Sequence, residues 1–314
     1  MKNSYLVIIL IPFVFLQMTS CKKKFPVPEY KPPSLEKSKL FYSTFNSIRQ
    51  IDVSNNEWTV HYESSNSSSI YGLNFVENQD KLWFTSSFPA GVWEIKPLYQ
   101  HYQYNEFRQV FNSSLSSPSD VETDNTTGAT YVAANYSVYK SNGNIVNLLN
   151  SINLVNQPFS LVVAKNHLIV AGVSQVSITN LSNMNTALFG NPNIGMAGFM
   201  CLGSNNIIYI TDPSNNSIKK LTENELDYAI QDLANNTTIT SSFSQITSGN
   251  LLNETGNSST IRGPIGIDVK GNSLYVTVDT GTNNPGRIVK IDAVTGNQTI
   301  FKNNVPGPRD IIVY

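Results

Sequence analysis

The stretch GPIGIDV at residues 263–269 is followed by LYVTV at 274–278 and RIVKID at 287–292. Each segment is short and rich in β-branched residues, and each is bounded by Gly, Pro, Asn or Asp, which is typical of β-strands joined by turns. The unit therefore predicts three consecutive strands, the first of which opens with a Gly-Pro pair.

The same unit recurs along the chain. Four further copies begin near Ile70, Pro118, Pro158 and Gly195. The step from Pro118 to Pro158 is 40 residues, and the step from Pro264 to Pro308 is 44 residues. A repeat of this length is typical of one blade of a β-propeller.

The two ends of the repeat region complement each other. GPRDIIVY at 307–314 is a first strand without a second, whereas 39–43 and 47–52 are a second and a third strand without a first. Joining them completes one blade and pairs strand edges that would otherwise be exposed. We therefore predict an all-β fold over 39–314, a six-bladed β-propeller of about 46 residues per blade, whose split first blade is closed by the N- and C-terminal strands.

Two repeats carry a family resemblance. YITDPSNNSIKKL at 209–221 resembles the core of an NHL repeat, where a strand ends at Asp, an Asn-containing turn follows and Ile-x-Lys begins the next strand. The segment 256–269 is similar to the loop that opens the following NHL blade, and LYVT at 274–277 with VKID at 289–292 resembles YVTN propellers. The NHL resemblance implies six blades and a binding surface, and the YVTN resemblance leaves seven blades as the alternative.

One insertion interrupts the repeats. Thr222 and Glu225 have the spacing of a capping box, and apolar residues follow at helical spacing, namely Leu226, Ala229, Ile230 and Leu233. We predict a short amphipathic helix whose apolar stripe packs on a neighbouring blade. A helix that docks a partner is the alternative.

The innermost strands predict a ring of side chains around the propeller axis. The equivalent position in the six blades is occupied by Asp310, Gly72, Asp120, Ser160, Gly198 and Gly266. Asp120 and Asp310 have two interpretations: they accept hydrogen bonds from neighbouring backbone amides, or they hold Ca²⁺ together with water and carbonyl oxygens. The nearby run from Asp120 through Glu122 to Asp124 lacks the spacing of a calcium loop and is interpreted as a solvated turn.

One region is dense in aromatic residues. It contains Trp83, Phe88, Trp93, Tyr99 and Tyr102. Alternating aromatic residues on strands fill the space between blades, but the same residues could line a groove for a glycan or peptide ligand.

The N-terminal segment predicts export. Lys2 precedes an apolar run from Tyr5 to Leu16, which is too short to span a bilayer and has the length of a signal-peptide core. Met18-Thr19-Ser20-Cys21 resembles a bacterial lipobox. We predict a lipoprotein signal peptide at 1–20, a lipidated Cys21 with a Lys- and Pro-rich tether over 21–38, and a cell-envelope protein anchored to a membrane on the periplasmic side or the cell surface. A plain secretory signal is the alternative.

The composition limits the remaining functions. A net charge of −1 with 14% charged residues and no basic block argues against nucleic acid as a partner. Paired metal-ligand spacings and nucleophile motifs are absent from the sequence, and Cys201 lies in an apolar stretch typical of a buried small hydrophobe. We therefore predict a binding or scaffold module for a protein, glycan or peptide, without a catalytic residue or cofactor. The alternative is a metal-assisted hydrolase or lyase with an axial cation at Asp120 and Asp310.

Overall fold

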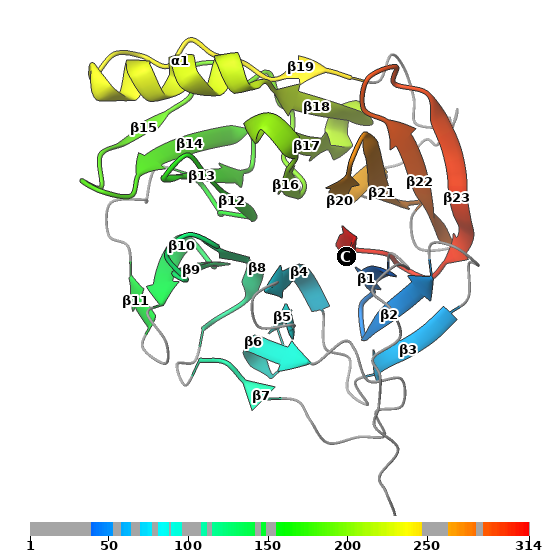
Figure 1. Ribbon diagram of the computed structural model, residues 1–314. Helices are drawn as coiled ribbons and strands as arrows, with labels where there is room; N and C mark the ends of the chain where they lie inside the picture. Colours follow the sequence, from blue (N-terminus) through cyan, green and yellow to red (C-terminus); the bar gives the residue numbers. More distant parts are fainter. Residues whose placement is uncertain are drawn as a thin grey trace, which may run out of the picture. The chain divides into compact units, whose positions relative to one another are not determined.

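The computed structural model contains six four-stranded antiparallel sheets that follow one another around a ring (Figure 1). The structure describes residues 39–52, 58–63, 70–76, 81–87, 89–95, 108–111, 115–141, 146–148, 155–246, 263–280 and 285–313. The predictions for residues 1–38 lie outside this part of the chain. The described sheets confirm an all-β six-bladed β-propeller.

Each blade runs from an innermost strand at the axis to an outermost strand at the rim. In that order, blade 1 contains β24 (Ile311–Val313), β1 (Lys39–Ser43), β2 (Ser47–Asp52) and β3 (Trp58–Glu63); blade 2 contains β4 (Ile70–Val76), β5 (Lys81–Ser87), β6 (Ala90–Ile95) and β7 (Arg108–Gln109); and blade 3 contains β8 (Pro118–Thr123), β9 (Thr130–Ala134), β10 (Ser137–Ser141) and β11 (Val146–Leu148). Blade 4 contains β12 (Ser160–Ala164), β13 (His167–Gly172), β14 (Gln175–Asn180) and β15 (Thr186–Leu188); blade 5 contains β16 (Met200–Leu202), β17 (Ile208–Asp212), β18 (Ser217–Leu221) and β19 (Ser244–Gln245); and blade 6 contains β20 (Gly263–Lys270), β21 (Ser273–Asp279), β22 (Gly286–Asp292) and β23 (Gln298–Val305).

The split blade closes as predicted. β24 lies antiparallel to β1, with Ile311 opposite Tyr42 and Val313 opposite Leu40. Just before the strand, the Ser43 N–H donates to the Asp310 carbonyl at 2.9 Å, and the Arg309 N–H donates to the Ser43 carbonyl at 2.8 Å. The last described strand thus completes the sheet begun by the first.

Apolar packing joins each blade to the next. The buried apolar side chains of the described residues fall into six clusters, and each cluster combines residues of two neighbouring blades. The cluster between blades 6 and 1, for example, contains Leu40, Tyr42, Tyr275, Ile288 and Ile311. Because each blade packs against both of its neighbours, no apolar blade face is exposed as long as the ring is closed.

Hydroxyl groups near the axis add a second repeated contact. The Thr85, Thr211 and Thr277 hydroxyls donate to the carbonyls of Ser119, Ile265 and Arg309 in the next blade, at 3.2, 2.6 and 2.5 Å. The inner strands approach so closely that a Cβ on Gly72 would lie 2.7 Å from the Asp120 Cα. The close approach of the strands therefore excludes a larger side chain at Gly72.

The first strand of blade 5 differs from its prediction. The sequence predicts a strand at 195–199, whereas β16 begins at Met200. The Gly195 and Met196 N–H groups donate to the Asp212 carboxylate, each at 3.2 Å. These two amides are therefore bound by a side chain and not by a partner strand.

The predicted helix is present as α1 (Glu223–Ala234) (Figure 1). Thr222 and Glu225 form the capping box, and Leu226, Ala229 and Leu233 are buried in the cluster shared by blades 4 and 5. The apolar stripe thus packs on the ring, as expected. Among the described residues, α1 included, we find no helix with the length and apolar character needed to cross a membrane.

Candidate functional site

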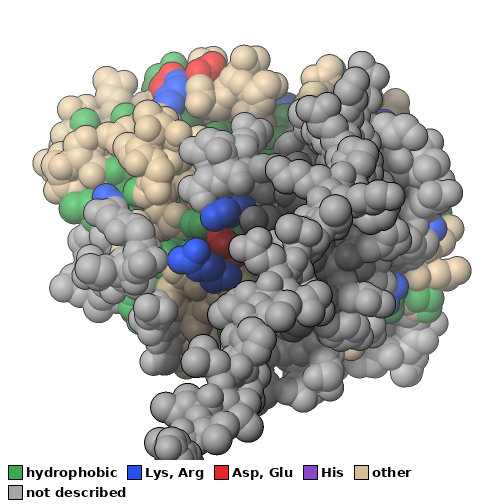
Figure 2. All heavy atoms as spheres, turned by 60° about the horizontal axis from the view of Figure 1, so that its bottom comes forward, with side chains coloured by type: hydrophobic (Ala, Val, Ile, Leu, Met, Phe, Trp, Pro, Cys, Tyr) green, Lys and Arg blue, Asp and Glu red, His purple; other side chains and the backbone are tan. Residues whose placement is uncertain are grey.

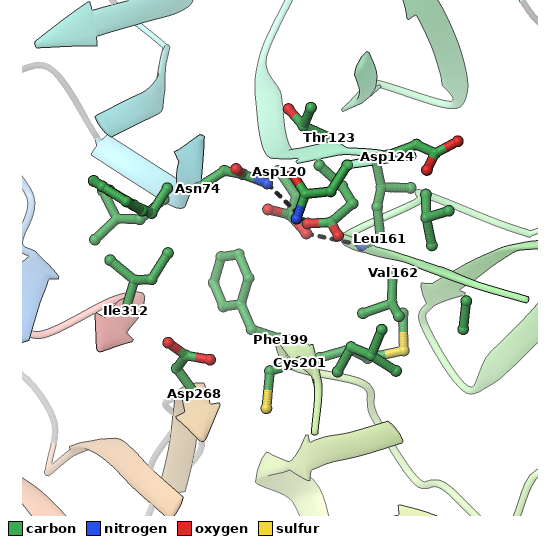
Figure 3. A pocket seen from close by; sticks show the side chains of 18 of the residues that line it. Asn74, Asp120, Thr123, Asp124, Leu161, Val162, Phe199, Cys201, Asp268 and Ile312 are labelled. Carbon is green, nitrogen blue, oxygen red and sulfur yellow. Dashed lines mark hydrogen bonds between the residues drawn. The ribbon is translucent and has the colours of Figure 1, made fainter. Parts of the chain in front are cut away.

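A cavity of about 410 Å³ lies on the propeller axis (Figure 3). All six innermost strands contribute to its wall, from Leu73 in β4 to Ile312 in β24. The turns that follow β8, β12 and β16 contribute residues such as Asn125, Lys165 and Asn206. A cavity of this volume is in the range of small-ligand and side-chain binding sites.

Apolar rings meet at the axis near the start of the inner strands. Phe159 from blade 4 and Phe199 from blade 5 lie with ring centroids 4.9 Å apart. Tyr71 from blade 2 packs against the cluster of blades 5 and 6. Of these rings, Phe199 lines the cavity, and together with Leu73 and Leu161 it gives the wall an apolar component.

Five carboxyl groups also line the cavity, namely Asp124 in the turn after β8 and four others, Asp120, Glu122, Asp268 and Asp310. Asp120 and Asp310 occupy the predicted ring position, and Glu122 and Asp268 lie two residues after that position in their own strands. In the view of Figure 3, Asp120 and Asp268 lie on opposite sides of the Phe199 ring. The interpretation of Glu122 as part of a solvated turn is wrong, because Asp120 and Glu122 both belong to β8 and alternate residues of a strand face the same side.

Three of these carboxylates bind backbone amides across blade boundaries. Asp120 Oδ2 accepts hydrogen bonds from the Leu161 N–H at 2.8 Å and the Ser160 hydroxyl at 2.9 Å. Asp310 Oδ2 accepts from the Leu73 N–H at 2.7 Å, and Asp268 Oδ2 accepts from the Val313 N–H at 2.6 Å. Amides on the inner edge of a blade have no partner strand, so these side chains satisfy donors that would otherwise be buried without an acceptor.

Glu122 is held differently. Its Oε2 accepts a hydrogen bond from the Asn74 side-chain amide at 2.8 Å, which links blades 2 and 3. No lysine or arginine of the described residues forms an ion pair with Glu122 or with the three aspartates. The described lysines and arginines therefore leave these four carboxyl groups without an ion-pair partner.

Burial shifts the acidity of all four groups. It raises the pKa of Asp120 from 3.8 to about 7, against the opposing hydrogen bonds from Leu161, Ser160 and Val121. It likewise raises the pKa of Asp268 to about 7. For Glu122 and Asp310, burial first and the charge of Asp120 second raise the pKa well above the ordinary value.

These shifts predict an unusual pH dependence of stability. Between pH 4 and 7 the folded chain retains protons on Asp120 and Asp268 that the unfolded chain has lost, so the free energy of unfolding falls as the pH rises. Each such carboxyl contributes about 1.4 kcal/mol per pH unit within that window. We expect a higher melting temperature at pH 5 than at pH 7, measured by circular dichroism.

A pair of variants checks the source of this dependence. Glu122→Gln removes one buried carboxyl group and should reduce the change in melting temperature between pH 5 and pH 7. Glu94→Gln removes a carboxylate that pairs with Lys81 away from the axis, and it should leave the pH dependence of the melting temperature unchanged. A melting temperature that increases from pH 5 to pH 7 would contradict the assignment.

The calcium prediction stays untested. Among the residues that the structure describes, we find no group of three or more His, Cys, Asp or Glu side chains positioned to hold a metal ion. Asp120 and Asp310 do accept the backbone amides that their alternative interpretation requires. A cation at these two residues would compete with those hydrogen bonds.

The aromatic region is only partly described. Trp83 is 7% exposed and packs edge-on against Phe111 in the cluster of blades 2 and 3, which agrees with the interpretation that aromatic residues fill the space between blades. Trp93 is half-buried against the cluster of blades 1 and 2, and its indole N–H donates to the Pro89 carbonyl at 3.3 Å. Phe88, Tyr99 and Tyr102 lie outside the described residues, so the ligand groove stays a prediction.

Cys201 is buried, as predicted, but it also lines the cavity. Burial, and then the charges of Asp268, Asp310 and Glu122, raise the pKa of its thiol well above the ordinary value. The thiolate needed for nucleophilic attack is therefore disfavoured at this position.

Comparisons with known proteins support the fold. No protein-family model matches the sequence, and no curated protein sequence matches it. The structure is similar to a chain in the crystal structure of a nidogen/laminin complex, with a TM-score of 0.67 and 12% identity over 88% of this chain and 98% of that chain. At this identity the similarity shows a shared β-propeller fold, which hosts many different functions.

Proposed function

We propose that the chain is a lipid-anchored binding module of a bacterial cell envelope, which holds a basic side chain of a peptide or protein ligand in its axial cavity. The β-propeller fold is consistent with a binding or scaffold module. The observation that carries the proposal is the axial cavity, whose wall contains five carboxyl groups that form no ion pair with a lysine or arginine of the described residues.

The mixed lining favours an organic cation. Lys and Arg side chains combine an apolar stem with a charged head. Leu73, Leu161 and Phe199 suit the stem, while Glu122 and Asp268 suit the head. The carboxylates are spread around the wall and do not form one compact ligand set among the described residues, which also favours a hydrogen-bonding ammonium or guanidinium over a small metal ion.

Two further features support a binding role. The repeat at 209–221 resembles the NHL repeat, whose propellers present binding surfaces, and six blades agree with that resemblance. The similar chain noted above was solved in a complex of nidogen with laminin. The metal-assisted hydrolase or lyase would instead require Asp120 and Asp310 to exchange their amide hydrogen bonds for a metal bond.

A matched pair of peptides tests the proposal. We expect the full-length protein in detergent to bind acetyl-Gly-Lys-Gly-amide, and to bind the analogue with norleucine in place of lysine about tenfold more weakly, since a charge-assisted contact contributes about 1.4 kcal/mol. Isothermal titration calorimetry measures both. Glu122→Gln should weaken binding of the lysine peptide, while Glu94→Gln removes the same charge elsewhere and should not.

The outcomes are distinct. Equal affinity for the two peptides, or no binding of the lysine peptide, would refute a cation-binding cavity. Stoichiometric Ca²⁺ binding that disappears in both Asp120→Asn and Asp310→Asn would favour the metal-dependent alternative.

The anchor has its own test. Acylation of Cys21 attaches the chain to a membrane, so Cys21→Ala should move the protein from the membrane fraction to the soluble fraction and out of the detergent phase in Triton X-114 partitioning. Ser20→Ala is the matched control, because it retains a small residue before the cysteine. Unchanged partitioning of Cys21→Ala would contradict lipid anchoring.

A further inference from the structure

Helix α1 contacts the wall of the axial cavity through charged side chains. Its apolar residues Leu226, Ala229 and Leu233 are 0, 0 and 2% exposed, so the helix is a fixed support on blades 4 and 5. Glu223 and Asp227 are four residues apart and therefore lie on the same side of the helix. Figure 2, which is turned by 60° from the view of Figure 1, shows acidic and basic side chains next to one another at its upper edge.

These two acids hold residues from the cavity wall. Lys165 Nζ lies 2.6 Å from Asp227 Oδ1 and 3.0 Å from Glu223 Oε1. The Asn206 side-chain amide donates to the same Glu223 oxygen at 3.0 Å. Lys165 belongs to blade 4 and Asn206 to blade 5, and both line the cavity. The helix thus fixes two parts of the wall at once.

Lys165 is the only lysine or arginine among the described residues that line the cavity. It lies in the two-residue turn between β12 and β13, where Lys165 has φ +48° and Asn166 has φ +58°. Gly, Asn and Asp adopt this left-handed backbone most readily, and a lysine there costs about 1 kcal/mol or more. The backbone gives no reason for a lysine at this position, so its ammonium group is the feature that needs an explanation.

We propose that α1 sets the charge selectivity of the axial cavity by holding the Lys165 ammonium at the rim. The five carboxyl groups in the wall lack an ion-paired cation from the described residues, and Lys165, with its long flexible side chain, belongs to the same wall. Glu223 and Asp227 outcompete those carboxyl groups for the ammonium, which leaves them without an internal cation and available to a cation from a ligand. Without the two acids, Lys165 becomes an internal competitor of that ligand. This inference rests on the proposed cation-binding function.

The first test uses the lysine peptide defined above. Glu223→Gln with Asp227→Asn should weaken binding of acetyl-Gly-Lys-Gly-amide by about fivefold, a change of the size expected for releasing a solvent-accessible ion pair. Adding Lys165→Asn, which suits the turn and removes the ammonium, should restore the affinity. Equal affinity of the wild type and the double variant for the peptide would overturn the inference. A triple variant whose affinity remains as low as that of the double variant would overturn it as well.

The second test does not depend on any ligand. An ammonium that turns inward neutralises part of the charge of Asp120, Glu122, Asp268 and Asp310, with Asp124 beside them in the wall. The double variant should therefore lose less stability between pH 5 and pH 7 than the wild type, and the triple variant should regain the wild-type dependence. If the wild type fails to bind the peptide but these pH profiles hold, the proposed ligand is wrong and the role of α1 stands. If the three profiles coincide, the role of α1 is wrong.

Discussion

Removal of residues 311–314 should abolish the cooperative unfolding transition of the propeller. β24 supplies the innermost strand of blade 1, and Ile311 is 2% exposed in the cluster between blades 6 and 1. The deletion exposes that cluster, leaves Leu40 and Tyr42 without their partner strand, and removes the amide that binds Asp268. The combined loss should exceed about 5 kcal/mol, which is comparable with the total stability of a domain.

A point variant provides the quantitative test, because it retains every strand of the ring. Ile311→Ala should lower the free energy of unfolding by about 2–5 kcal/mol, the range for a buried isoleucine. Ile300→Ala on β23 makes the same chemical change at a residue that is 46% exposed and should have a much smaller effect. Urea denaturation measures both, and equal losses would show that β24 does not close the ring.

Asp212→Asn should cost about 3–5 kcal/mol, because it leaves the Lys219 ammonium buried without a counter-charge. The two side chains are 0% and 4% exposed, and Lys219 Nζ lies 2.9 Å from Asp212 Oδ2. Asp212 also accepts from Gly195, Met196 and Asn215, while Lys219 donates to the Asn193 carbonyl. The pair therefore fastens the segment that enters blade 5.

Two controls identify the cause of the loss. Asp212→Asn combined with Lys219→Met removes both charges and should recover much of the stability, since a buried pair contributes little relative to apolar replacements. Glu94→Gln breaks the more exposed pair with Lys81 and should cost about 1 kcal/mol or less. Equal losses for Asp212→Asn and Glu94→Gln in urea denaturation would contradict the assignment.

The same carboxylate has a defined pH response. Burial alone would raise the pKa of Asp212, but hydrogen bonds from Lys219, Asn215 and two backbone amides outweigh it and lower the pKa. A lowered pKa stabilises the fold above the unfolded value of about 4 and loses that stability as the pH falls below it. The loss of stability due to Asp212 occurs below about pH 4, whereas Asp120 and Asp268 change the stability between pH 4 and 7. The two contributions can therefore be separated by pH.

The fold was predictable because its signals are local and repeated. Each blade has the same order of short apolar strands and polar turns. The pattern is weak in a single blade, but its repetition along the chain identifies the fold. The ends at 39–52 and 307–314 then identified the closure. The start of blade 5 was not predictable, because Asp212 binds the amides of Gly195 and Met196 from a distant position in the sequence.

The site was predictable only in part. The ring position located Asp120 and Asp310, because strand order alone places equivalent residues at the axis. Glu122 and Asp268 were missed, although each lies two residues further along an inner strand and therefore faces the same side. Their alternation with apolar neighbours was the available signal. The contact between α1 and Lys165 joins an insertion to a turn more than 50 residues away, and only the structure reveals it.

Amide hydrogen exchange of the wild-type protein tests the closed ring most directly. The Val313 and Leu73 amides donate to Asp268 and Asp310, and β24 pairs with β1. The segment 309–313 should therefore exchange as slowly as 39–43 and in the same cooperative opening. Exchange of 309–313 within seconds, while the strands of blades 2–6 remain protected, would show that the chain does not close on itself and would remove the axial cavity with it.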